Sequence, residues 1–118
     1  MTFEEFETLI EESFNSLPDK FKSILIKNEI KLLPRQKAPK PLKSSYPGSV
    51  VFGVFIGVPL GRFVNVQLEP TRIELYKESF EKVFKEPEQM KAQIKSTVIH
   101  EIAHYFGFYE KQIRKLGY

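Results

Sequence analysis

The chain has 118 residues, which is enough for one domain around a single modest core. It contains no cysteine, so disulfides and thiolate metal sites are excluded, and any transition metal must be held by histidine and carboxylate. The net charge is only +3 and the lysines are scattered among glutamates, which argues against a nucleic-acid-binding surface.

Two further features predict where the protein works. Residues 1–14 are acidic and amphipathic, whereas a secretory signal begins with basic residues and continues with an apolar run. The most apolar stretch, residues 50–60, is about half the length of a transmembrane helix and contains glycine and proline. Together with the lack of cysteine, these features predict a cytoplasmic protein with no membrane partner.

The first part of the chain predicts two helices, a strand and a loop. Apolar residues at three- and four-residue steps indicate an amphipathic helix from the N-cap Thr2 to about Ser16. Pro18 begins a second, short helix over residues 18–25, and residues 28–34 fit a short strand. Residues 34–43 are basic, and their three prolines indicate an irregular solvated loop; the alternative, an arm that contacts phosphate, rests on charge alone.

The rest of the chain predicts strands followed by one long helix. β-Branched and aromatic residues in 49–57 indicate a buried strand, and alternating apolar residues indicate two more at 62–68 and 71–77. Helical spacing returns from Glu88 to Phe106, and Gly107 ends that helix. The predicted fold class is α+β: one domain over residues 1–118, with a single sheet of three to four strands packed by helices.

Both histidines lie on this last helix, in the sequence HEIAH. His100 and His104 are about 40° apart round the helix and one turn apart along it, so both imidazoles can reach one ion. This H-E-x-x-H spacing is that of hydrolases in which the two histidines bind Zn²⁺ and the glutamate, here Glu101, takes a proton from the attacking water. The alternative is a pair of half-buried histidines that hydrogen-bond to their neighbours.

A catalytic zinc ion needs a third protein ligand. The chain has no further histidine and no cysteine, so this ligand must be a carboxylate. Glu110 follows His104 by six residues, and Gly107 between them lets the chain leave the helix and turn back, as in the frame H-E-x-x-H-x-x-G-x-x-H. The rival carboxylates rank lower because they lie on or near predicted strands: Glu69, Glu74 and Glu78.

The segments LPDKF, GVFIGVPL, PTRIELYKESF and TVIHEIAHYFGFYEKQIRKLGY resemble, in this order and at similar spacing, the small bacterial zincin-like metallopeptidase family. These proteins are minimal relatives of the metzincins and carry H-E-x-x-H-x-x-G-x-x-D/E. The resemblance covers most of the chain from Leu17 onward and implies a small mixed sheet flanked by helices, with substrate along the sheet edge above the active-site helix. Carried over by position, it implies His100, His104 and Glu110 as metal ligands and Glu101 as general base.

The chain departs from the metzincin pattern at two places. Only eight residues follow Glu110 and none is methionine, so the methionine turn beneath the metal has no counterpart. Tyr105 stands where members of the family often have a second consecutive histidine, and it either faces substrate or packs. Tyr109, Arg114 and Tyr118 have a similar pair of roles open to them, oxyanion stabilisation or packing.

We therefore expect a zinc metallopeptidase that acts on a peptide or protein substrate and has no nucleic-acid partner. The alternative is a non-catalytic zinc-containing binding module. Glu101 favours the enzyme, because a structural zinc site needs no base beside the metal. The sequence predicts neither the cleavage specificity nor the oligomeric state.

Overall fold

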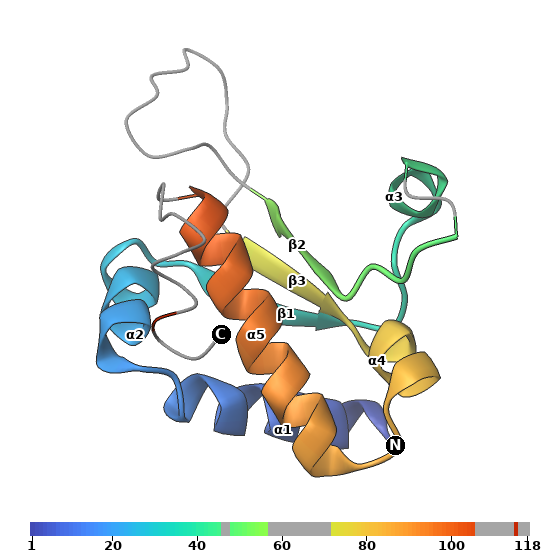
Figure 1. Ribbon diagram of the computed structural model, residues 1–118, viewed down its shortest axis with the longest axis horizontal. Helices are drawn as coiled ribbons and strands as arrows, with labels where there is room; N and C mark the ends of the chain where they lie inside the picture. The colour runs from blue at the N-terminus through green and yellow to red at the C-terminus, as the bar shows by residue number, and fades with distance from the viewer. Residues whose placement is uncertain (46–47, 57–71, 106–114, 116–118) are drawn as a thin grey trace.

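A computed structural model describes residues 1–45, 48–56, 72–105 and 115 (Figure 1). Five helices and three strands lie in the described part of the chain. In chain order they are α1 (Phe3–Asn15), α2 (Asp19–Lys27), β1 (Lys31–Arg35), α3 (Lys40–Ser45), β2 (Gly53–Ile56), β3 (Arg72–Tyr76), α4 (Lys77–Val83) and α5 (Pro87–Tyr105).

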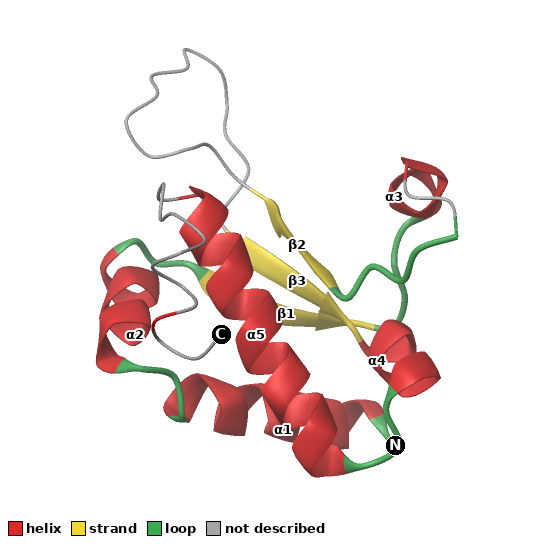
Figure 2. Cartoon of the chain, in the orientation of Figure 1, coloured by secondary structure: helices red, strands yellow, loops and turns green. Residues whose placement is uncertain are grey.

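The three strands form one mixed sheet in the order β1-β3-β2 (Figure 2). β1 runs parallel to β3, and β2 runs antiparallel to it. β3 lies in the centre, and its side chains alternate between the two faces, so that Ile73 and Leu75 enter the core on one face. The α+β class and the mixed sheet expected from the sequence are confirmed.

Helix α5 crosses one face of the sheet, and α1 packs against it on the same side (Figure 1). A single apolar cluster joins residues of the helices and of the central strand, among them Phe6, Phe21, Ile73, Leu75, Ile94 and Ile102, none of which is exposed. Burial of such residues is the main favourable term in folding, and it fixes α5 over the sheet. None of the described helices is long and apolar enough to span a bilayer.

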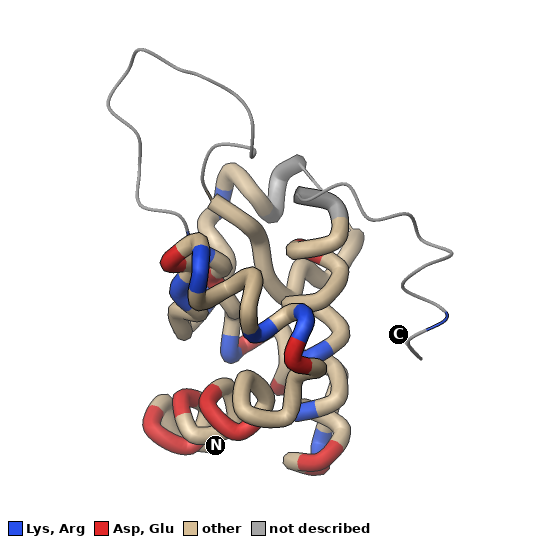
Figure 3. The backbone as a smooth tube through the Cα atoms, turned by 90° about the vertical axis from the view of Figure 1, so that its left-hand side faces the viewer, with Lys and Arg blue, Asp and Glu red and all other residues tan. Residues whose placement is uncertain are grey.

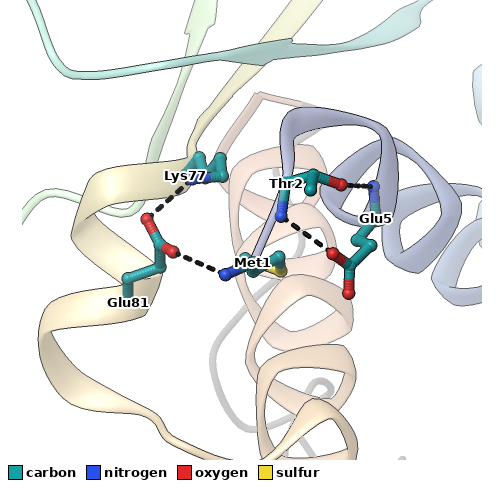
Figure 4. A network of polar contacts seen from close by, with 5 residues as sticks. All are labelled: Met1, Thr2, Glu5, Lys77 and Glu81. Atoms are coloured by element: carbon teal, nitrogen blue, oxygen red, sulfur yellow. Dashed lines mark hydrogen bonds and ion pairs between the residues drawn. The ribbon is translucent and has the colours of Figure 1, made fainter.

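The start of α1 is held by a capping box and by contacts to α4 (Figure 4). Thr2 Oγ1 accepts the backbone N–H of Glu5, and Glu5 Oε1 accepts the backbone N–H of Thr2, both at 3.0 Å. Glu81 binds the α-ammonium group of Met1 at 3.5 Å and Lys77 Nζ at 2.9 Å. The N-cap expected at Thr2 is therefore confirmed, and the two helices are joined at this end of the molecule.

The face of β3 opposite α5 carries a buried carboxylate. Glu74 Oε2 accepts from Arg35 Nε at 3.1 Å and from Arg72 Nε at 3.0 Å, and Tyr76 Oη donates to Glu74 Oε1 at 3.4 Å. Burial alone would raise the pKa of Glu74, but the two arginines hold it below its ordinary value. This cluster ties β1 to β3 on the polar side of the sheet.

The structure departs from the sequence-based expectations at three places. Residues 34–43, expected as an irregular loop, run into α3, where Pro41 occupies the first turn and its missing N–H is tolerated. β2 is shorter than the strand expected over 49–57. No sequence pattern predicted α4. The strand expected at 62–68 lies outside the described residues.

Candidate active site

Helix α5 packs one side into the core and carries a stripe of polar residues beside it. Its buried side includes residues that are at most 1% exposed: Ile94, Val98, Ile99 and Ile102. The polar stripe consists of half-buried residues at three- and four-residue steps: Gln93, Ser96, Thr97, His100 and Glu101. The structure therefore brings His100 and Glu101 together on the side of α5 that is not packed into the core.

A cavity of about 430 Å³ opens between this polar stripe and the segment that leads into β2. Along α5 its lining runs from Gln93 to Glu101, and across from the helix it is formed by residues 49–54 and by Leu42 of α3. Its volume falls in the range of roughly 300–1,000 Å³ that is usual for ligand sites. Among the described lining residues there is no lysine and no arginine.

The width of the cavity depends on Gly53, the first residue of β2. A Cβ atom at this position would lie 2.6 Å from the backbone oxygen of Glu74, 2.9 Å from Leu75 Cδ2 and 3.2 Å from Thr97 Cγ2. A side chain does not fit without a shift of the strand or the helix. Glycine thus lets β2 lie against α5 one turn before His100.

The outer edge of β2 presents backbone groups beside the cavity. The backbone N–H of Tyr76 donates to Phe52 O at 2.9 Å, and the antiparallel register continues with Gly53 opposite Leu75. Hydrogen-bonded and non-hydrogen-bonded pairs alternate in such a ladder, so the N–H and C=O groups of Gly53 and Phe55 point away from β3. No strand in the described part of the chain pairs with this edge.

Several residues of the predicted site lie outside the part of the chain that the structure describes. His104 follows His100 by one turn in α5, but the placement of its side chain is not described, and the same holds for Tyr105. Gly107 and Glu110, with the turn expected between them, lie outside the described residues. Tyr109, Arg114 and Tyr118 lie outside them as well.

The upstream carboxylates that could rival Glu110 are placed elsewhere where they are described. Glu74 binds two arginines on the sheet face away from α5, and Glu78 in α4 forms an ion pair with Lys82 at 3.6 Å. Glu69 is not described. Among the described side chains, which do not include that of His104, no three or more of histidine, cysteine, aspartate or glutamate are placed to hold an ion.

Sequence reasoning missed the wall of the cavity. Gln93, Ser96 and Thr97 precede His100 at helical spacing, and this periodicity was a signal that could have extended the site toward the N-terminus of α5. Gly53 gave no comparable signal, because its importance comes from the close approach of β3 and α5, two elements that are distant in sequence.

A comparison with sequence families relates the chain to known proteins. The model of the family described as zincin-like metallopeptidase matches residues 30–118, well over half of the chain. The chain belongs to this family. A search of curated proteins found no match. The family match begins at Ile30, so α1 and α2 of this zincin-like chain lie before the matched region.

The family implies zinc, and the described residues fit this metal. Histidine is among the preferred zinc ligands, and the imidazole of His100 lines the cavity. The lining described here carries no lysine or arginine that would repel a cation, and Glu101 adds a negative charge next to His100. The zincin-like chain thus presents an imidazole suited to bind zinc and a carboxylate suited to act as a base at the same end of its cavity.

Proposed function

We propose that the protein is a zinc-dependent peptidase in which His100, His104 and Glu110 hold the metal and Glu101 is the general base. Membership of the zincin-like metallopeptidase family supports both the metal and the class of reaction. The observation that carries the proposal is the cavity lined by His100 and Glu101, on a helix whose apolar side is packed into the core.

The metal and the side chains of the site would have separate roles in the reaction. A bound zinc ion would polarise the scissile carbonyl as a Lewis acid. The carboxylate of Glu101 would take a proton from the attacking water and deliver it to the nitrogen of the leaving amine. Because the apolar side of α5 is packed into the core, His100 and Glu101 are held in a fixed relation to each other, which favours a fixed orientation of the reacting groups.

The substrate would bind as an extended peptide. The outward N–H and C=O groups of Gly53 and Phe55 can pair with the main chain of a peptide laid along β2. Such pairing recognises a backbone of any sequence and would hold a peptide bond beside His100 and Glu101. A peptide substrate therefore fits this edge better than a compact small molecule does.

The test combines metal analysis with a peptide-library assay. The purified protein should contain about one zinc ion per chain and cleave peptides, and Glu101→Gln should keep its zinc while hydrolysis falls by roughly 10² or more. The matched control is Glu86→Gln, the same change at an exposed residue that does not line the cavity. It should leave both zinc content and hydrolysis unchanged.

The result can contradict the proposal in two ways. Loss of zinc and of the folded state in Glu101→Gln would show that Glu101 is structural. Zinc binding without cleavage of any peptide by the parent protein would instead favour the zinc-containing binding module.

A further inference from the structure

The cavity extends well beyond the groups that the reaction needs. Eight residues separate Gln93 from Glu101, which is roughly 12 Å along the helix at 1.5 Å per residue. The opposite wall, residues 49–54 with Leu42, accompanies this part of α5. There is thus room beside His100 and Glu101 for a long side chain that runs toward the N-terminus of α5.

The described lining of this space carries a negative charge at its reaction end and no positive charge. Glu101 is the only carboxylate among the described lining residues and stands at the reaction end, and the described lining includes no cationic side chain. A charged group that leaves water is strongly disfavoured unless it finds a partner. Among the described lining residues an acidic side chain would meet no cation near Gln93, and a basic one that reached Gln93 would point away from Glu101.

The end of the space near Gln93 is polar but neutral. Gln93 Nε2 donates to Thr97 Oγ1 at 3.2 Å, which fixes the amide group on the polar stripe. An amide of this kind can donate a second N–H and can accept at its oxygen. On the way to this amide the opposite wall offers apolar side chains, those of Leu42, Val51 and Val54.

We propose that the part of the cavity between Thr97 and Gln93 is a specificity pocket that selects a long uncharged side chain of the peptide, with Gln93 as its determinant. This inference rests on the proposed function, because the peptide is placed along β2 by the same argument. The pocket accepts the apolar stem of a leucine, methionine or glutamine against Val51 and Val54, and Gln93 gives the amide tip of a glutamine a neutral hydrogen-bonding partner.

The test uses peptides of the form acetyl-Ala-Ala-X-Ala-Ala-amide, in which X is leucine, glutamine, lysine or glutamate. X is the only large side chain, so it is the one that enters the pocket whatever the position of the cleaved bond. Cleavage is measured as kcat/KM with the zinc-loaded protein. Binding is measured separately as Kd by NMR titration of the Glu101→Gln variant, which gives a readout that does not depend on turnover.

We expect the parent to prefer leucine and glutamine over lysine and glutamate by about tenfold or more. Gln93→Glu places a carboxylate at the far end of the pocket. It should raise kcat/KM for the lysine peptide relative to the leucine peptide by about tenfold or more. The matched control is Gln89→Glu, the same change on the preceding turn of α5, at an exposed residue outside the cavity. It should leave the order of the four peptides unchanged.

The outcomes separate this inference from the proposed function. A neutral preference in binding without any cleavage supports the pocket and contradicts the peptidase. Cleavage with a preference for a charged X, or an identical profile in Gln93→Glu and Gln89→Glu, overturns the pocket and leaves the peptidase standing. If the protein neither binds nor cleaves any of the four peptides, the proposed pocket is overturned. Gln93→Leu keeps this end of the pocket neutral and controls for a folding defect. It should lower kcat/KM only for the glutamine peptide relative to the leucine peptide.

Discussion

Gly53 is the residue whose size matters most for the geometry of the cavity. Gly53→Ala would force its Cβ to within 2.6 Å of a backbone oxygen, and backbone cannot turn away as a side chain can. We expect a loss of about 1–3 kcal/mol in the free energy of unfolding, as is typical of overpacking. Because the added Cβ would also lie 3.2 Å from Thr97 Cγ2 of α5, β2 should move away from α5 and widen the cavity.

Gly48→Ala is a control of the same chemical size. Gly48 has a φ of +79°, and no atom lies within 4 Å of the position of a Cβ there. Its substitution should cost about 1 kcal/mol through backbone strain alone. The two variants can be separated by the NMR amide shifts of Thr97 and His100, which should change in Gly53→Ala only. Unchanged shifts in Gly53→Ala would show that the strand accommodates the methyl group elsewhere.

At the scale of elements, the capping box decides how firmly α1 begins. Thr2→Ala removes the oxygen that accepts the Glu5 N–H, and it should lower the free energy of unfolding by about 1 kcal/mol. Thr8→Ala is the matched control on the same helix, since Thr8 is exposed and bonds only the carbonyl of Glu4 one turn earlier. Alanine has the higher helix propensity, so this change should be neutral or slightly stabilising. Equal losses in urea denaturation would contradict a special role for the cap.

The elements that the sequence predicted are those whose pattern is local. The apolar spacing of α1 and α5 and the alternation in β3 could be recognised without knowledge of their neighbours. α4 could not, because it follows Tyr76 with no turn residue between strand and helix and has only seven residues. Its stability comes from Phe80, which is fully buried and packs against Phe6 and Phe52 at ring-centroid distances of 5.6 and 5.0 Å.

The site divides in the same way. His100 and Glu101 could be predicted because one helix supplies both and the helical repeat fixes their relation. The opposite wall of the cavity comes from residues 49–54 and α3, and no local pattern says that these segments fold back onto α5. The assignment of His100, His104 and Glu110 as ligands and of Glu101 as base stays a prediction.

At the scale of the whole molecule, charge is unevenly spread. Acidic residues gather along α1 (Figure 3), where the exposed carboxylates are Glu4, Glu5, Glu7, Glu11 and Glu12. Lys91 of α5 meets Glu12 at 3.1 Å and Glu88 at 3.0 Å. Ion pairs at a solvated surface contribute little to stability, so they do not set the pH range over which the fold survives. That range depends on the buried titratable groups of β3.

Tyr76 sets the alkaline limit. Its side chain is fully buried, and burial, together with the negative charge and the hydrogen bond of Glu74, raises its pKa from 10.0 to about 12. An acid whose pKa is raised by folding holds its proton more tightly in the native state than in the unfolded chain. Its contribution to stability is therefore complete below pH 10 and is lost as the pH rises from 10 toward 12.

This prediction can be checked by urea denaturation between pH 8 and pH 12. The free energy of unfolding of the parent should fall above pH 10 by an additional amount of about 1.4 kcal/mol per pH unit from this one group. Tyr76→Phe has no proton to lose, so its decline should be less steep by that amount, although it starts from a lower value because the bond to Glu74 is gone. Lysines and the other tyrosines titrate in both proteins and cancel in the difference. Parallel curves for the two proteins above pH 10 would mean that Tyr76 ionises in the folded state as easily as in the unfolded chain, and that the centre of the sheet is open to water.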